Sequence, residues 1–152
     1  METRLSAGQP APYFEGVDQH GQTIRLTDLQ GKKLVLYFYP KDDTPGCTAQ
    51  ACNLRDNYQE LLDAGYHVIG ISPDPQKSHL KFIEKYQLPF PLIADTEKKI
   101  LQDYGVWGPK KFMGRAYDGV HRTTFVVDER GVILDVIAKV DTKNHADQII
   151  QK

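Results

Sequence analysis

The chain has no long hydrophobic run, no cluster of like charges and no internal repeat, and it contains only two cysteines among its 152 residues. No window approaches the roughly 20 apolar residues of a transmembrane helix. Lys and Arg total 19 against 20 Asp and Glu and are spread along the chain, so the electrostatic footprint of a nucleic-acid or acidic-membrane partner is missing. We therefore expect neither a nucleic acid nor a membrane as a partner.

The N-terminal residues, Met1 to Ala11, lack the apolar core of a signal peptide, so we expect a cytoplasmic protein. A permanent structural disulfide is not expected in a reducing cytosol. Cys47 and Cys52 are therefore either two plain thiols or a redox pair, and composition leaves both open. No Pro/Gly/Ser-rich linker divides the chain, and its 40% hydrophobic content suits a single domain over residues 1–152.

Segments typical of strands and of helices alternate along most of the chain. The run from Leu34 to Tyr39 is apolar and aromatic throughout, as in a strand covered on both faces of a sheet, and it ends at Pro40. Apolar residues then recur with helical spacing from Ala51 to Leu62, and Gly65 is placed to end that helix. The other predicted elements are a hairpin at 13–26, a strand at 67–72, a helix at 77–86, a strand at 90–94, a helix at 96–104, a loop at 105–122, a hairpin at 123–140 and a helix after 144. This order predicts an α/β fold with a mixed central sheet flanked by helices and an N-terminal β-hairpin, and it resembles the thioredoxin-like fold.

The loop between the first core strand and its helix carries the most informative segment. Thr44 before Pro45 is typical of an N-cap followed by proline at the first helical position, which places Cys47 in the first turn. There, unpartnered N–H groups and the helix dipole favour the thiolate, which is the nucleophilic form. The same N–H groups suit the oxygen that gains charge when a peroxide O–O bond breaks. Because cysteine is also among the most buried residue types, these features alone leave a reactive and an inert Cys47 equally open.

Cys52 adds information through its distance from Cys47. On an ideal helix, residues five apart have Cα atoms about 8 to 9 Å apart, whereas a disulfide requires less than about 7 Å. A bond between the two cysteines therefore requires the first turns of the helix to unwind. Cys47 shares the inward face with Ala51 and Leu54, and Cys52 lies on a more polar flank beside Arg55, which suits a thiol that must be released. The alternative for Cys52 is a small helix residue without a role.

Taken together, Pro40, Thr44 and Cys47 resemble the peroxiredoxin signature. The segment FYPKDDTPGCTAQAC followed by LRD resembles that of the Q-type subgroup, also called bacterioferritin comigratory proteins. The likeness continues through GISPD, YGVWG, FMGRAYDGVHRTTFVVD and the late NHA, and so covers nearly the whole chain. It implies a thioredoxin-like fold and a monomeric thiol peroxidase that reduces hydrogen peroxide and organic hydroperoxides without a metal or other cofactor.

The resemblance also implies roles for five residues. Cys47 is expected to be the peroxidatic cysteine, and Cys52 matches the resolving position. Thr44 is expected to hydrogen-bond the sulfur and the incoming peroxide, and Pro40 to shield the thiolate from water. Arg122 matches the arginine beside the thiolate, whose charge stabilises the anion and orients the peroxide.

The chain departs from the family pattern in two places. Gln50 stands where many relatives carry Glu, so a carboxylate contact to Arg122 is expected to be lost. Leu54 stands where Phe is frequent, which concerns packing more than chemistry. Three further apolar residues are expected either to form a wall near the site or to be buried in packing: Trp107, Phe112 and Met113.

The expected cycle takes Cys47 to a sulfenic acid, then to an intramolecular disulfide with Cys52, and back to the thiols through thioredoxin or a similar dithiol. The main alternative is a general thiol-disulfide oxidoreductase without peroxidase activity, which should carry C-x-x-C, a motif absent from this sequence. A zinc module is disfavoured because the two cysteines and five histidines lack zinc-ligand spacing. A noncatalytic protein that keeps the fold stays open, whereas a cysteine hydrolase is disfavoured because no histidine is tied to Cys47 by a local signature.

Overall fold

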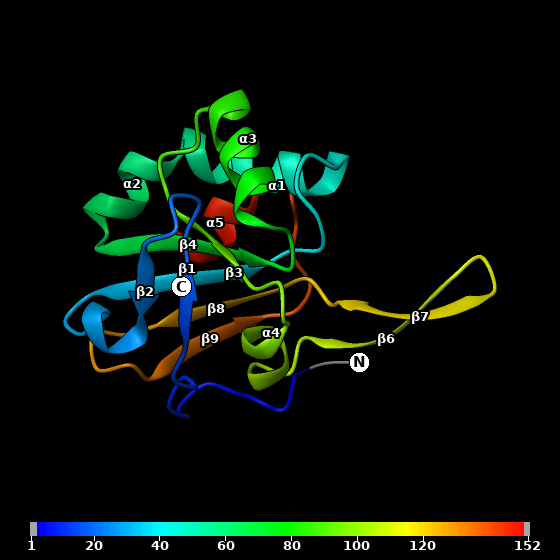
Figure 1. Cartoon of the computed structure of the whole chain (residues 1–152). Coiled ribbons are helices and arrows are strands. Elements are labelled where there is room, and N and C mark those ends of the chain that lie inside the picture. The colour runs from blue at the N-terminus through cyan, green and yellow to red at the C-terminus, as the bar shows by residue number, and fades with distance from the viewer. Residues whose placement is uncertain (1–2, 151–152) are drawn as a thin grey trace.

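In the computed structural model of the chain, which describes residues 3–150, a five-stranded mixed sheet forms the centre, with strand order β5-β4-β3-β8-β9 (Figure 1). The middle strand, β3, is parallel to β4 and antiparallel to β8. β5 extends the parallel side of the sheet and β9 the antiparallel side. The strands are β3 (Lys33–Phe38), β4 (Tyr66–Ser72), β5 (Leu92–Ala94), β8 (Thr123–Val127) and β9 (Ile133–Ile137). The most apolar run of the sequence thus becomes the central strand, and every residue from Leu34 to Phe38 is buried.

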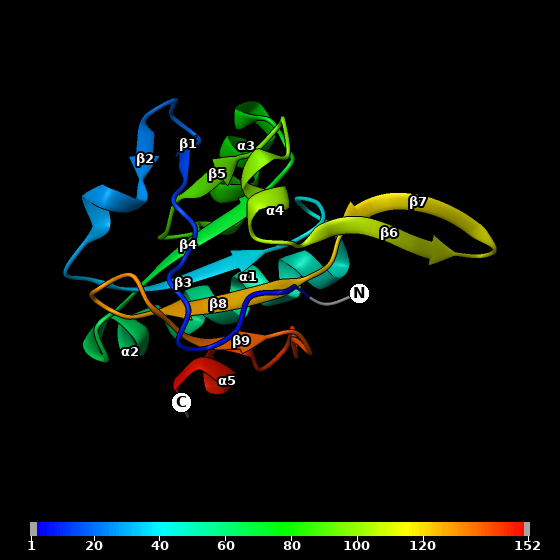
Figure 2. The ribbon, with the colours of Figure 1, turned by 90° about the horizontal axis from the view of Figure 1, so that it is seen from below.

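Side-chain alternation along β3 divides the core into two apolar clusters, one on each face of the sheet. Val35 and Tyr37 point to one cluster, and Leu34 and Leu36 point to the other. Helices α1, α2, α3 and α5 contribute to the first cluster, whereas α4 and the N-terminal segment contribute to the second (Figures 1 and 2). The helices are α1 (Pro45–Asp56), α2 (Tyr58–Asp63), α3 (Gln76–Tyr86), α4 (Lys99–Asp103) and α5 (His145–Ile150). None of these described helices is long and apolar enough to span a bilayer.

Two small hairpins lie outside the central sheet. The first pairs β1 (Glu15–Val17) with β2 (Thr23–Arg25), which confirms the predicted N-terminal hairpin, and a 3-10 helix, η1 (Leu26–Leu29), follows it. The second pairs β6 (Trp107–Phe112) with β7 (Arg115–Val120) and projects from the body of the molecule (Figure 2). The sequence predicts a loop there, and the hairpin corrects that prediction. Most residues of this hairpin are exposed. Its sequence therefore lacks the alternation of apolar and polar residues by which a half-buried strand is recognised.

The helix predicted over residues 51–62 is divided at Asn57 into α1 and α2. The side chain of Asn57 donates to the carbonyl of Asn53 at 2.8 Å, which competes with the regular backbone bond of that turn. Gly65 follows α2 with a φ of 91°, a left-handed conformation that glycine adopts without strain, so it ends the helical segment as predicted. The interruption leaves α1 as a separate helix that carries both cysteines.

Candidate active site

Cys47 lies in the first turn of α1, as the Thr44-Pro45 pair predicts. Thr44 occupies the N-cap position with extended backbone angles, Pro45 is the first helical residue, and the first helical bond joins the N–H of Thr48 to the carbonyl of Thr44. The N–H groups of Gly46 and Cys47 come before that bond, so the helix supplies no carbonyl for them. The sulfur therefore lies at the positive end of the helix dipole.

The guanidinium of Arg122 lies directly against this sulfur. Its Nη2 donates to Cys47 Sγ at 3.3 Å. Arg122 immediately precedes β8, and the pairing of β8 with β3 carries it to the start of α1. A Cβ atom at Gly46 would lie 3.3 Å from Nη2, so the glycine allows the guanidinium to approach the helix closely. A permanently charged donor at the sulfur favours the thiolate.

Gln50 provides the second contact of Arg122. Its amide oxygen accepts a hydrogen bond from Nη1 at 2.5 Å. The sequence predicts the loss of a carboxylate contact here, and the structure adds that the neutral amide takes its place. Gln50 is fully buried, and its Nε2 finds no hydrogen-bond partner among the described residues. The amide orients Arg122 without placing a second anion beside the guanidinium.

The thiol of Cys47 is more enclosed than expected for a reactive sulfur, with only 1% of the residue exposed. It belongs to the apolar cluster that includes Ala51, Leu54 and, from α5, Ala146. Packing of α5 and Arg122 over the inward face of α1 produces this enclosure. A small oxidant therefore finds little open surface through which to reach the sulfur.

Thr44 and Pro40 both lie close in sequence to the start of α1, and the hydroxyl of Thr44 is directed away from the role expected for it. The hydroxyl of Thr44 donates to the carbonyl of Lys41 at 2.8 Å, so it neither caps the helix nor binds Cys47. The turn before the helix passes through Asp43, whose φ is 56°, and this turn brings the carbonyl of Lys41 within reach. Pro40 is half-buried and lies two residues after the end of β3.

Cys52 lies on the next turn of α1 and is half-buried. Both cysteines are free thiols, and α1 is continuous from Pro45 to Asp56. On a regular helix this spacing is too long for a disulfide. The observed helix therefore agrees with the expectation that oxidation to a disulfide requires α1 to unwind.

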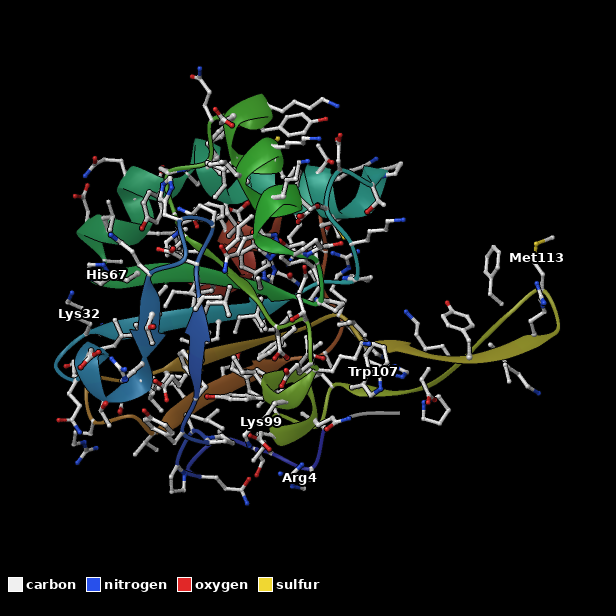
Figure 3. The ribbon with its side chains drawn as sticks, in the orientation of Figure 1. Arg4, Lys32, His67, Lys99, Trp107 and Met113 are labelled. Atoms are coloured by element: carbon white, nitrogen blue, oxygen red, sulfur yellow. The ribbon has the colours of Figure 1, made fainter. Side chains whose placement is uncertain are left out.

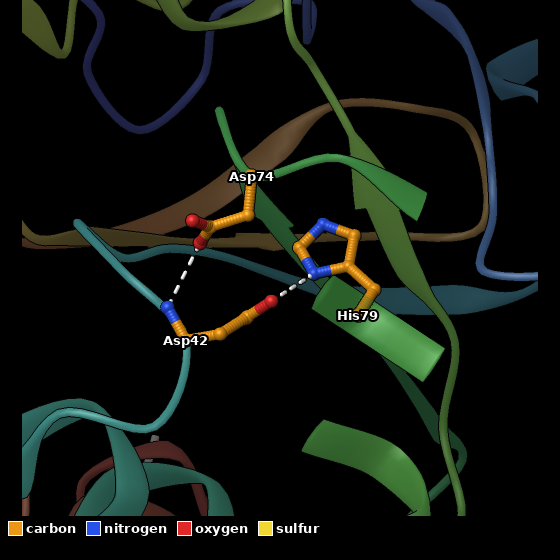
Figure 4. Close-up of side chains that lie close together, drawn as sticks. All are labelled: Asp42, Asp74 and His79. Carbon is orange, nitrogen blue, oxygen red and sulfur yellow. Dashed lines mark hydrogen bonds and ion pairs between the residues drawn. The ribbon is translucent and has the colours of Figure 1, made fainter. Parts of the chain in front are cut away.

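A buried polar cluster anchors the loop that precedes α1 (Figure 4). Asp42 accepts hydrogen bonds from the hydroxyls of Tyr39 and Ser78, each at 2.7 Å, and its other close partner is His79 Nδ1 at 2.7 Å. The backbone N–H of Asp42 donates to Asp74 at 2.8 Å. Burial, followed by the negative charges nearby, raises the pKa of Tyr39 well above its ordinary value, so Tyr39 stays a donor. These bonds fix the loop to α3 and to the end of β4.

The ligand atoms of Asp42, Asp74 and His79 lie within 4.8 Å of one another, a spacing that a metal ion could bridge. The hydrogen bonds argue against that use. His79 Nε2 lies 3.0 Å from the carbonyl of Ile93 and so carries a proton, while Nδ1 lies only 2.7 Å from Asp42. Asp74 already accepts from the N–H of Asp42 and from Ser72. The cluster is therefore a structural anchor, and neither cysteine belongs to it.

Phe112 and Met113 follow neither of the two alternatives expected for them, an apolar wall near the site or buried packing. Phe112 is 66% exposed and Met113 is 86% exposed, both near the tip of the β6–β7 hairpin. Figure 3 shows Met113 at the far end of the hairpin and Trp107 at its base. Trp107 packs against the core cluster that includes Val120, so only this residue has the packing role expected. Hairpin formation carries the other two side chains away from the body.

The sequence did not indicate the roles of Gln50, Asp42, His79 and Asn53. For Gln50, the signal in the sequence is its departure from the family pattern. His79 meets Asp42 across 37 residues of sequence, and Asn53 meets Ala146 across 93. No local pattern encodes contacts of this range.

A family model for the AhpC/TSA family matches residues 7–136 of the chain. The chain is 49% identical to a putative peroxiredoxin Bcp of Haemophilus influenzae, over 96% of this chain and 94% of that protein. The crystal structure of the peroxidoxin BcpB of Mycobacterium tuberculosis is similar with a TM-score of 0.86 and 35% identity, covering 97% of this chain and 96% of the other. A structure from work on alkyl peroxide reduction by the Xanthomonas campestris bacterioferritin comigratory protein matches with a TM-score of 0.85 and 31% identity, over 91% of this chain and 88% of the other.

Proposed function

The chain belongs to the AhpC/TSA family and is a peroxiredoxin, a thiol-dependent peroxidase with a thioredoxin-like fold, and we propose that Cys47 is its peroxidatic cysteine and Cys52 its resolving cysteine. The observation that carries the proposal is the guanidinium of Arg122 at 3.3 Å from Cys47 Sγ, at the start of a helix. Helix dipole and cation both stabilise the anionic form of the sulfur.

In the first step, the thiolate of Cys47 attacks one peroxide oxygen. The S–O bond forms as the O–O bond breaks, the sulfur is oxidised to sulfenic acid, and the other oxygen leaves as water or an alcohol after it takes up a proton. The charge of Arg122 and the N–H groups of Gly46 and Cys47, which lack helical partners, would stabilise the oxygen that gains charge and so lower the barrier to O–O cleavage.

In the second step, the thiol of Cys52 attacks the sulfenic sulfur of Cys47. The S–S bond forms, the S–O bond breaks, and the hydroxyl leaves as water with the thiol proton. A dithiol reductant then supplies two electrons and restores both thiols by exchange. We assign this role to thioredoxin or a similar dithiol protein, acting in the cytoplasm, where a reducing environment keeps a cycling disulfide from becoming permanent.

We propose that both hydrogen peroxide and organic hydroperoxides are substrates. The similarity to a protein studied for alkyl peroxide reduction supports the organic class. Thr44 would bind the incoming peroxide only after its hydroxyl leaves Lys41, and Pro40 would limit access of water from the end of β3. We further propose a monomer, as the resemblance to the Q-type subgroup implies.

Intact mass after one equivalent of hydrogen peroxide tests the proposed roles. The parent chain should lose two hydrogens through a Cys47–Cys52 disulfide, and addition of a dithiol should reverse that loss. Cys52→Ser should instead gain one oxygen on Cys47, because the resolving thiol is absent. Cys47→Ser should show neither change.

Circular dichroism of each variant controls for loss of the fold. Oxygen uptake on Cys52 in the Cys47→Ser variant would reverse the assignment of the two thiols. A parent chain that turns over disulfides but leaves peroxide unchanged would favour a general thiol-disulfide oxidoreductase instead.

A further inference from the structure

Asn53 directly follows Cys52 and connects this part of α1 to the C-terminal helix. Its Nδ2 donates to the carbonyl of Lys143 at 2.9 Å, and its Oδ1 accepts from the backbone N–H of Ala146 at 2.8 Å. Ala146 lies in the first turn of α5, whose N–H groups lack helical partners. One amide therefore uses both its donor and its acceptor to hold the Cys52 turn against another element.

The segment that Asn53 binds is itself fixed to the central sheet. His145 is fully buried, with Nε2 at 2.8 Å from the hydroxyl of Thr124 in β8 and Nδ1 at 2.7 Å from Gln148 Oε1. Gln148 Oε1 also accepts from the N–H of Asp141, so it acts as an acceptor and His145 Nδ1 must donate to it. Nε2 then accepts from Thr124. This bond ties the start of α5 to the sheet, so Asn53 holds the Cys52 turn to a rigid element.

The opposite end of the segment that must rearrange is also fixed. Asp42 is held by the buried cluster with His79 and Asp74 (Figure 4). Between these anchors, Cys47 is joined to Asp42 by five residue steps, which can extend to at most about 17 Å. That length gives Cys47 room to move toward Cys52 once the first turns unwind, without displacing either anchor.

We propose that Asn53 is a positioning residue for the resolving step. It holds Cys52 in place against α5 while residues 45–51 unwind, so that the sulfenic sulfur of Cys47 moves to a stationary thiol. Holding one reactant fixed raises the effective concentration of the other in the intramolecular step. This inference rests on the proposed assignment of the two cysteines. It adds that residues 45–51 of α1 move in the resolving step, whereas the turn that carries Cys52 stays in place.

Rapid acid quench followed by intact mass measures the two chemical steps separately in the Asn53→Ala variant. Loss of the reduced species reports attack on peroxide, and loss of two hydrogens reports disulfide closure. Removal of two hydrogen bonds of ordinary strength should slow closure by about tenfold. Attack by Cys47 should stay within about twofold, because Arg122 and Gln50 are unchanged. The longer-lived sulfenic acid should also be overoxidised at a lower excess of peroxide.

Two further variants sharpen the comparison. Asn53→Asp keeps the acceptor for Ala146 but loses the donor to Lys143, so its closure rate should lie between those of the parent and Asn53→Ala. Gln59→Ala removes an exposed amide whose bond goes to Asp63 in the same helix, and it should leave both rates unchanged. A general loss of stability would slow both steps together, and that outcome, like unchanged or faster closure, would overturn the proposal.

Hydrogen exchange on the parent chain gives a test that does not depend on any variant folding. In the oxidised protein, amides of residues 48–51 should exchange rapidly, while the N–H of Asn57, which donates to the carbonyl of Asn53, should stay protected. Loss of protection through Asn57 would contradict a fixed Cys52 turn. If peroxide produces no disulfide in the parent, the proposed function fails first, and the two failures are thereby distinguished.

Discussion

At the scale of single residues, the guanidinium of Arg122 joins the two polar side chains that α1 turns inward. It contacts the thiol of Cys47 and the amide oxygen of Gln50. A glutamate at position 50 would compete with the thiolate for this positive charge, whereas the amide orients the guanidinium without neutralising it. The buried Nε2 of Gln50 has no partner among the described residues, and such a donor typically costs about 1 to 3 kcal/mol of stability.

Replacing Arg122 with Met should slow the reaction of the chain with peroxide by about 100-fold, as expected when one charge-stabilising donor is removed. The side chain keeps its apolar length but loses the charge that stabilises the thiolate and the departing oxygen. Single-turnover kinetics under varied hydrogen peroxide would measure the rate constant. Arg130→Met is the matched control, because Arg130 is exposed and its ion pair with Asp128 spans 3.7 Å. Equal rates in the parent and Arg122→Met would remove Arg122 from the site.

At the scale of elements, α5 is the short helix that covers the cysteine-bearing face of α1. It contributes Ala146 and Ile149 to the apolar cluster that contains Cys47. Its position depends on His145, which is neutral with a proton on Nδ1. Burial, followed by the charge of Arg122, lowers the pKa of His145, while Gln148 and Asp141 oppose the shift. Because protonated Nε2 would no longer accept from Thr124, the attachment of α5 is sensitive to acid.

This geometry predicts how stability depends on pH. The pKa of His145 is lower in the folded chain than its ordinary value of about 6.5, so the unfolded chain binds the proton more readily. The contribution of His145 is therefore fully present above about pH 6.5 and is lost as the pH falls toward the folded pKa, with a slope of at most about 1.4 kcal/mol per pH unit. Urea unfolding between pH 7.5 and 5 should show this decrease.

The His145→Gln variant serves as the comparison for that pH series. It should be less stable than the parent at pH 7, because it loses the fit of the imidazole between Thr124 and Gln148. Its free energy of unfolding should vary less with pH below 6.5, because the titrating group is absent. Parallel pH curves for the parent and the variant would show that His145 does not control the acid sensitivity.

At the scale of the whole molecule, the two apolar clusters share a single sheet. Leu34 and Val35 are neighbours on β3 but belong to opposite clusters, so neither cluster can come apart without exposing one face of the central strand. We therefore expect residues 1–152 to unfold as one cooperative unit. The projecting β6–β7 hairpin is attached at its base by Trp107, which packs against the second cluster.

The fluorescence of Trp107 and far-ultraviolet circular dichroism should report the same urea midpoint. Trp107 is the single tryptophan of the chain and senses the second cluster, whereas circular dichroism senses all helices and strands. Coincident curves would support a single domain. An earlier transition in fluorescence would mean that the hairpin and the face beside it separate from the rest before the sheet unfolds.

Local patterns in the sequence determined the start of α1, the placement of Cys47 in its first turn, the buried strand β3 and the N-terminal hairpin. These features depend on the preference of proline for the first helical position and on side-chain periodicity, both of which act over a few residues. The C-x4-C spacing likewise determined that a disulfide is incompatible with an intact helix. Arg122 was identified as a site residue by the family resemblance, because no local pattern in the sequence marks it.

Tertiary structure alone decided the contacts that complete the site. The pairing of Arg122 with Cys47 and Gln50, the anchoring of Asp42 by His79, and the attachment of Asn53 to α5 join residues between 37 and 93 positions apart. Packing of helices on the sheet sets these distances, and periodicity carries no information about which faces meet. The exposure of Phe112 and Met113 was likewise decided by tertiary structure. Both residues lie in a hairpin whose strands are mostly exposed, so no hydrophobic periodicity in the sequence indicated the hairpin.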